Sequence, residues 1–253
     1  MIKICHYASL TPFPDGKLAS RGGVCYNSDF WPQLTSTMNT LIRQLQENPE
    51  RYIGSINVFA LRAFADGYKC CLAQIGVNVD RTTQAWDEFV HHLETDGRRS
   101  PGSPTYQMYL AAYSDTAALH LCLDELQRCT VYVDQGYAQE QNGASVSASC
   151  DIFTQLDDVR RRIVMYLPFT TIEMLFAFSS GFSNAAITHP SKSDMARANL
   201  EEFERWLCNK YELQGRCRWD RLILVHSNFD QGKALPKFFE ELDCFREHSQ
   251  SES

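Results

Sequence analysis

Two Asx-Gly dipeptides, each lying between apolar runs, are the strongest local signals of structure in this chain. They are Asp66-Gly67 and Asn142-Gly143. Such dipeptides favour the positive φ angles of a tight turn between antiparallel strands. The sequence therefore predicts two β-hairpins. Their strands would be residues 52–64 and 68–77 in the first hairpin, and residues 130–139 and 144–150 in the second.

The last of these segments alternates strictly between apolar and polar side chains. Single serines separate its apolar residues, which are Ala144, Val146, Ala148 and Cys150. Because successive side chains of a strand point to opposite faces, this pattern predicts a strand with one buried and one solvated face. Shorter apolar runs are also interpreted as strands, at residues 2–7, 160–167 and 222–226.

Apolar residues recur at helical spacing between the predicted strands, which is typical of amphipathic helices. The expected helices are residues 32–45, a segment after Asp80 that carries Trp86 and Phe89, a segment from Ser114 or Asp115 to Leu126, residues 193–213 and residues 234–246. Residues 170–178 begin with the capping-box spacing Thr-Thr-Ile-Glu, but they fit a buried strand equally well.

Together these segments predict an α+β fold, with a mixed, mostly antiparallel sheet covered by amphipathic helices. No shift in composition marks a domain boundary, so residues 1–253 are expected to form a single domain. The order strand, helix, hairpin occurs at residues 2–77 and 106–150, which would fit an internal duplication. Residues 248–253 are expected to be a frayed tail.

Charge and cysteine content narrow the classes of function. The formal net charge of -7 argues against nucleic acid or an anionic membrane as a general partner, because such binders present a basic face. The sequence begins without an apolar signal region and has no long apolar run, so a cytoplasmic protein with reduced thiols is expected. A basic protein partner remains compatible with this charge.

Catalytic and metal-binding signatures are missing from the sequence. The 10 cysteines and 7 histidines do not adopt the paired spacing of a zinc site, and neither the Gly-x-Ser-x-Gly element nor a nucleotide-binding glycine motif occurs. We therefore expect no metal, no cofactor and no catalytic residue. The alternative is a small-molecule enzyme with a carboxylate-based site or a cysteine nucleophile, for which Cys25 with His6 or His226 is the candidate.

Acidic clusters are the remaining functional signal. A single cluster is most simply a solvated helix face, but several together would form a negative surface for a basic partner and accelerate its encounter. One aromatic residue in the irregular N-terminal stretch could anchor the same interface. The candidate binding residues are Asp157, Asp158, Glu201, Glu202, Glu204, Glu240, Glu241, Asp243 and Phe13.

Taken whole, the chain resembles the immunity proteins of bacterial toxin systems, and the immunity protein 52 family in particular. The resemblance rests on size, acidic charge and the course of residues 22–31 and 52–59. It implies a cytoplasmic protein that neutralises a cognate antibacterial toxin, such as a nuclease effector, by stoichiometric binding without a cofactor. It transfers no functional residue. A scaffold subunit that forms a stable oligomer is a third hypothesis.

Overall fold

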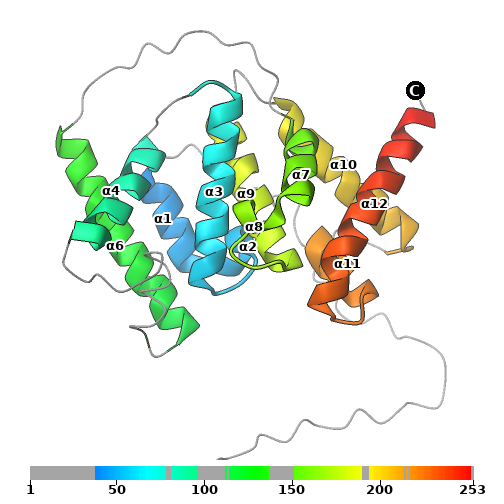
Figure 1. The fold of residues 1–253 in the computed structure, drawn as a ribbon, viewed down its shortest axis with the longest axis horizontal. Coiled ribbons are helices and arrows are strands. Elements are labelled where there is room, and N and C mark those ends of the chain that lie inside the picture. The colour runs from blue at the N-terminus through cyan, green and yellow to red at the C-terminus, as the bar shows by residue number, and fades with distance from the viewer. Residues whose placement is uncertain are drawn as a thin grey trace, which may run out of the picture. The chain divides into compact units, whose positions relative to one another are not determined.

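The structure is a computed structural model that describes residues 38–77, 81–95, 112, 114–136, 151–189, 194–213, 215 and 217–251 (Figure 1). In this part of the chain 82% of the residues are helical and no strand occurs, so the predicted α+β fold is wrong and an all-α fold replaces it. The chain divides into two units, Met1–Pro32 and Gln33–Ser253, and every described residue belongs to the second.

The described part of the chain consists of helices and the segments between them. In chain order they are α1 (Met38–Glu47), α2 (Pro49–Ile53), α3 (Val58–Gln74), α4 (Arg81–Thr95), α6 (Asp115–Gly136), α7 (Ile152–Arg161), α8 (Ile163–Tyr166), α9 (Ile172–Thr188), α10 (Asp194–Lys210), α11 (Trp219–His226) and α12 (Gln231–Ser251).

Helices α3 and α9 make the most extensive helix pair among the described elements (Figure 1). Their backbones meet at two glycines. An added Cβ on Gly67 would lie 2.0 Å from the carbonyl oxygen of Phe178, and one on Gly181 would lie 1.8 Å from that of Phe64. Residue 64 lies opposite residue 181, and residue 67 lies opposite residue 178. The residue numbers therefore rise in opposite directions along the two helices, which are antiparallel. Almost every residue of α9 is buried, which makes this pair the centre of the core.

The first predicted hairpin is therefore a helix. Its supposed turn, Asp66-Gly67, lies inside α3, where Gly67 has no side chain because α9 passes too close for a Cβ. Asn57 begins the helix, since its side-chain oxygen accepts a hydrogen bond of 2.7 Å from the backbone N–H of Phe59. The apolar run that suggested two strands is instead a helix buried on most of its circumference.

The other predicted strands are corrected in the same way wherever the structure describes them. Helix α6 continues to Gly136 and so includes the start of the second hairpin, whereas residues 137–150 lie outside the described residues. Residues 160–167 form the end of α7 and all of α8, and residues 222–226 belong to α11. Short apolar runs do not distinguish a strand from a buried helix, which is why these predictions failed. Residues 2–7 and 144–150 are not described.

Several helix predictions are confirmed. The side-chain oxygen of Ser114 accepts a hydrogen bond of 3.2 Å from the backbone N–H of Ala117 at the start of α6, and the predicted apolar stripe of that helix is buried. For residues 170–178, which fitted a helix and a strand equally well, the structure shows a helix: α9 begins at Ile172, and the side-chain oxygen of Thr171 caps it by accepting from the backbone N–H of Met174. The C-terminal helix is longer than predicted, because α12 continues to Ser251.

Two arginines connect the end of α2 to α11, far away in the sequence. Arg218 donates to the carbonyl oxygen of Glu50 at 2.6 Å, and Arg221 donates to that of Gly54 at 3.2 Å. Arg218 also forms two hydrogen bonds with the buried carboxylate of Asp220 and lies 4.0 Å from the centre of the Phe176 ring. The carbonyl oxygen of Glu50 also accepts from the backbone N–H of Gly54 at 3.2 Å, so the two arginines add to the hydrogen bonds at the end of α2 and hold it against α11.

Candidate functional site

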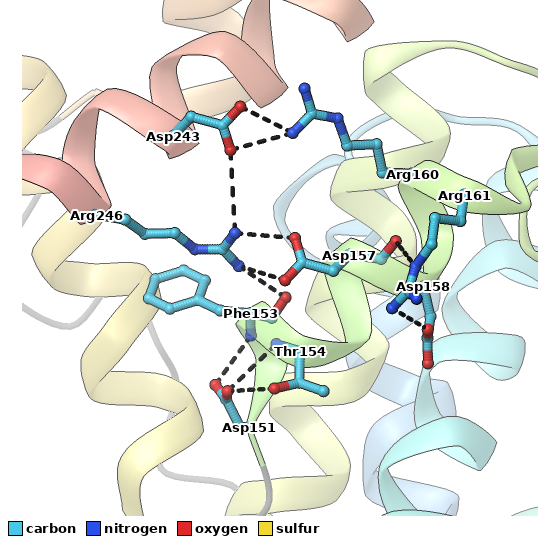
Figure 2. Close-up of polar contacts among 9 residues, drawn as sticks. All are labelled: Asp151, Phe153, Thr154, Asp157, Asp158, Arg160, Arg161, Asp243 and Arg246. Carbon is cyan, nitrogen blue, oxygen red and sulfur yellow. Dashed lines mark hydrogen bonds and ion pairs between the residues drawn. The ribbon is translucent and has the colours of Figure 1, made fainter.

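The best-formed polar cluster joins α7 to α12 (Figure 2). Arg246 of α12 donates to both carboxylate oxygens of Asp157 on α7, at 2.9 and 3.1 Å, and to the backbone oxygen of Phe153 at 3.0 Å. Its guanidinium also lies 5.5 Å from the centre of the Phe153 ring. A bidentate pair of this kind has a defined geometry and holds the two helices in one register.

A second ion pair, in which one guanidinium nitrogen of Arg160 contacts both carboxylate oxygens of its partner, extends the cluster in the opposite sense (Figure 2). Arg160 of α7 donates to the two carboxylate oxygens of Asp243 on α12, at 2.8 and 3.1 Å. Asp243 is also 4.0 Å from Arg246, so positive and negative charges alternate across the interface. On the outer side of α7, Asp158 pairs with Arg161 at 2.8 Å.

The beginning of α7 fixes the position of these residues. Asp151 is the N-cap, and its carboxylate accepts from the backbone N–H groups of Phe153 and Thr154 at 3.0 and 3.2 Å, as Figure 2 shows. It also accepts from the hydroxyl of Thr154 at 2.7 Å. Because the first turn is fixed, Asp157 and Arg160 are presented on the face of α7 that meets α12.

Glu241 is buried rather than on the surface, with 4% of the residue exposed. Its carboxylate accepts hydrogen bonds from Lys210 at 2.6 Å, from the hydroxyl of Tyr211 at 2.7 Å and from Lys237 at 3.3 Å. Burial by itself would raise the pKa of Glu241, but the hydrogen bonds and positive charge of its partners outweigh it and hold the pKa below its ordinary value. Burial and the bond to Glu241 raise the pKa of Tyr211 to about 12.

The remaining predicted acidic residues have mixed positions. Glu202 and Glu240 are exposed, whereas Glu201 and Glu204 are half-buried and each engages in interactions with its surroundings. Phe13 lies outside the described residues. The structure therefore brings together Asp157 and Asp243 through their arginines, but it does not gather the predicted acidic residues into one negative surface. Four of the eight, Asp157, Asp158, Glu241 and Asp243, pair with basic side chains within the fold.

Several of the described cysteines have thiols with raised pKa values. Burial raises the pKa of Cys70 and of Cys129 to about 11, and it raises the pKa of Cys122 still further. A thiol with a raised pKa is protonated at neutral pH and reacts slowly. Cys25 and His6 lie outside the described residues, while the ring of His226 stacks on that of Tyr211 with centroids 3.7 Å apart. Within the described part of the chain, no three His, Cys, Asp or Glu side chains are grouped to hold a metal ion.

The feature that sequence reasoning missed is an exposed apolar surface on α8 and the loop that follows it. Val164 is 83% exposed, Met165 71% and Phe169 49%. We call these three residues the α8 surface. They line an open groove of about 440 Å³ together with Tyr166, Leu167, Pro168 and, from α3, Phe59, Arg62 and Asp66. Its volume is within the range of about 300–1,000 Å³ that is usual for ligand pockets.

The α8 surface rests on well-packed supports. Leu167 is buried, and its backbone N–H donates to the carbonyl oxygen of Ile163 at 2.9 Å. The ring of Tyr166 packs edge-on against Phe178 of α9, with centroids 5.8 Å apart, and the ring of Phe169 packs edge-on against Phe59 at 4.9 Å. The short helix is thus held in place while its outer side chains face solvent. The prediction of a strand at 160–167 concealed this surface, because it placed alternate residues in the core.

Comparisons with known proteins add no identification. Protein-family models, curated proteins and solved structures were searched, and none matches this chain. Among the described residues, none of the helices combines the length and apolar character needed to cross a membrane.

Proposed function

We propose that this chain is a protein-binding protein that acts by stoichiometric association through the α8 surface. The observation that carries the proposal is the exposure of Val164, Met165 and Phe169 beside a groove. Single exposed apolar residues are ordinary, but a rim of them beside a groove, on a rigid support, is typical of an interaction site.

The chemistry of these side chains supports the same conclusion. Methionine adapts to the shape of a partner, and an aromatic side chain such as Phe169 removes a large apolar area from water when it is covered. The Arg62–Asp66 pair of α3, at 3.6 Å, also lines the groove and supplies polar groups that orient a bound segment. This composition, with apolar residues and a polar rim, is that of a transient protein interface.

Neutralisation of a cognate toxin is the particular role that we propose for this binding. It is supported by the resemblance of residues 22–31 and 52–59 to immunity proteins and by the net charge of -7. The acidic clusters support a toxin partner less than the sequence analysis predicts, since Asp157, Asp243 and Glu241 pair within the fold. A toxin partner would therefore engage the α8 surface rather than these carboxylates.

Identification of the partner, followed by a matched pair of variants, tests the proposal. The tagged protein is used to isolate its partner from the source cells, and both proteins are then purified and titrated by calorimetry. We expect a one-to-one complex, and we expect Val164→Ser with Met165→Ser to weaken it at least about tenfold, the loss of about 1.4 kcal/mol typical of an interface anchor. Val225→Ser is the control, because Val225 is also exposed but lies on α11.

Two results would contradict the proposal. One is the absence of any stoichiometric partner, and the other is a complex that the α8 variants leave unchanged. For the toxin role, expression of the partner alone should stop growth and co-expression of this chain should restore it. A partner that is harmless when expressed alone would remove the toxin role but leave protein binding in place.

A further inference from the structure

We propose that the segment bound at the α8 surface is acidic as well as apolar, with carboxylates that flank its apolar anchors. This inference rests on the proposed function, because it names the chemistry of the partner at the same site. It differs from the sequence-based expectation of a basic partner, which depended on acidic clusters in which Asp157, Asp158, Glu241 and Asp243 pair within the fold.

The charge next to the α8 surface is positive. Residues 160–162 are three consecutive arginines that lead directly into α8. Arg160 pairs with Asp243 and Arg161 pairs with Asp158. Arg162 is exposed, and its side chain has no ion pair or hydrogen bond among the described residues. Arg160, Arg161 and Arg246 each pair with an aspartate, whereas Arg162 does not. One positive charge is therefore left beside α8.

Arg162 is also in the right place to act with the apolar residues. It is the residue that precedes α8, and its carbonyl oxygen accepts a hydrogen bond of 2.9 Å from the backbone N–H of Met165. The guanidinium therefore extends from a backbone position one helical turn before Met165. A partner that covers Met165 brings its own charges within reach of this guanidinium.

A carboxylate fits an exposed guanidinium well, because two parallel N–H donors match its two oxygens. A basic segment would be repelled at the same position. Arg62, which lines the groove, is paired with Asp66, so these two residues add no net charge. The charge that flanks the α8 surface is then that of Arg162. An acidic segment with apolar anchors therefore satisfies both the α8 surface and its flanking charge.

Two short fluorescent peptides provide a direct test. One alternates Glu with Leu and Phe, and the other replaces every Glu with Lys while keeping the apolar residues. Anisotropy titrations use the full-length protein at low and high salt. We expect the acidic peptide to bind more tightly than the basic one by at least about tenfold, and to lose affinity as salt rises.

Variants separate the charge from the apolar contact. Arg162→Gln should weaken the acidic peptide about three- to tenfold, since it removes one flanking charge. Arg43→Gln is the matched control, because Arg43 is an exposed arginine on α1 and the change in net charge is the same. Val164→Ser with Met165→Ser should weaken both peptides.

The possible failures are distinguishable from one another. Equal binding of the two peptides, or an unchanged affinity in Arg162→Gln, would overturn the acidic inference. So would the absence of peptide binding while the partner complex is still lost in the α8 variants, and in that case the proposed function survives. Self-association through the α8 surface, detected by sedimentation and removed by the same variants, would show that the occupant is a second copy and would also overturn the inference.

Discussion

Replacement of Gly67 by alanine is expected to destabilise the protein strongly, because α3 and α9 are in backbone contact at this point. The added Cβ would lie 2.0 Å from the carbonyl oxygen of Phe178, whereas real Cβ contacts are essentially never below 3.0 Å. The helices must therefore separate by about 1 Å. Since the obstacle is a backbone atom of a buried helix, no side-chain rotation can relieve it.

The size of the effect follows from the separation. A gap of about 1 Å removes a quarter to a half of the dispersion energy of each contact across the interface, and overpacking of this kind costs about 1–3 kcal/mol or more. Alanine offsets about 1 kcal/mol of this cost, because it is a better helix former than glycine. Because the obstacle is a backbone atom, we place the overpacking cost at the upper end, about 3 kcal/mol, so the net loss in the free energy of unfolding should be about 2 kcal/mol, which lowers the melting temperature of a chain of this size by roughly 4–8 °C.

Urea unfolding monitored by circular dichroism measures this loss, and Gly232→Ala is the matched control. Gly232 is also helical, but it is exposed and its added Cβ would meet only the side chain of Asp230, at 3.3 Å. Its change should stay within about 0.5 kcal/mol. If Gly67→Ala and Gly232→Ala unfold at the same urea concentration, the close crossing of α3 and α9 is wrong.

A double variant tests whether the two glycines belong to one crossing. Gly181→Ala places a Cβ 1.8 Å from the carbonyl oxygen of Phe64 and should cost at least as much as Gly67→Ala. Once either alanine has separated the helices, the other meets less resistance. The double variant should therefore lose less than the sum of the single losses, with a coupling of about 1 kcal/mol. Strict additivity would show that the two contacts are independent.

Three further predictions concern the polar clusters. Glu241→Gln should lower the free energy of unfolding by about 1–3 kcal/mol in urea titrations, whereas exposed Glu240→Gln should change it by less than about 0.5; equal effects would contradict the burial of Glu241. Because the pKa of Glu241 is lowered in the fold, its stabilising contribution is present above the ordinary value of 4.5 and is lost as pH falls through the lowered pKa. The pKa of Tyr211 is raised, so its contribution is lost as pH rises from 10.0 to about 12. Glu241→Gln should reduce both slopes of the free energy of unfolding against pH. Asp157→Asn should cost only about 0.5–1 kcal/mol and less at high salt, because its pair with Arg246 is partly exposed; a loss that salt leaves unchanged would contradict this.

The candidate site shows what sequence reasoning about charge can and cannot reach. The sequence locates the acidic clusters, but the partners of several of their residues lie far away in the chain: Asp157 contacts Arg246, and Glu241 contacts Lys210. Whether a carboxylate is free or compensated depends on such distant contacts. The α8 surface was missed for a related reason, since Val164 and Met165 look like core residues until the packing of their neighbours leaves them outside.

The helices with clear periodicity and caps were determined by the sequence itself. Ser114 fixes the start of α6, and the apolar residues Leu200, Phe203 and Leu207 define the buried face of α10. These signals are local, because a helix satisfies its hydrogen bonds within its own segment and needs a partner only for one face.

The fold class was decided by tertiary structure alone. Asp66-Gly67 reads as a hairpin turn, and only the passage of Phe178 against Gly67 shows that the glycine permits two helices to touch. A run that is apolar on most sides is compatible with a buried helix and with a buried strand, since periodicity weakens when most faces are covered. The choice between them depends on which backbone lies opposite, and that neighbour is more than a hundred residues away in the sequence.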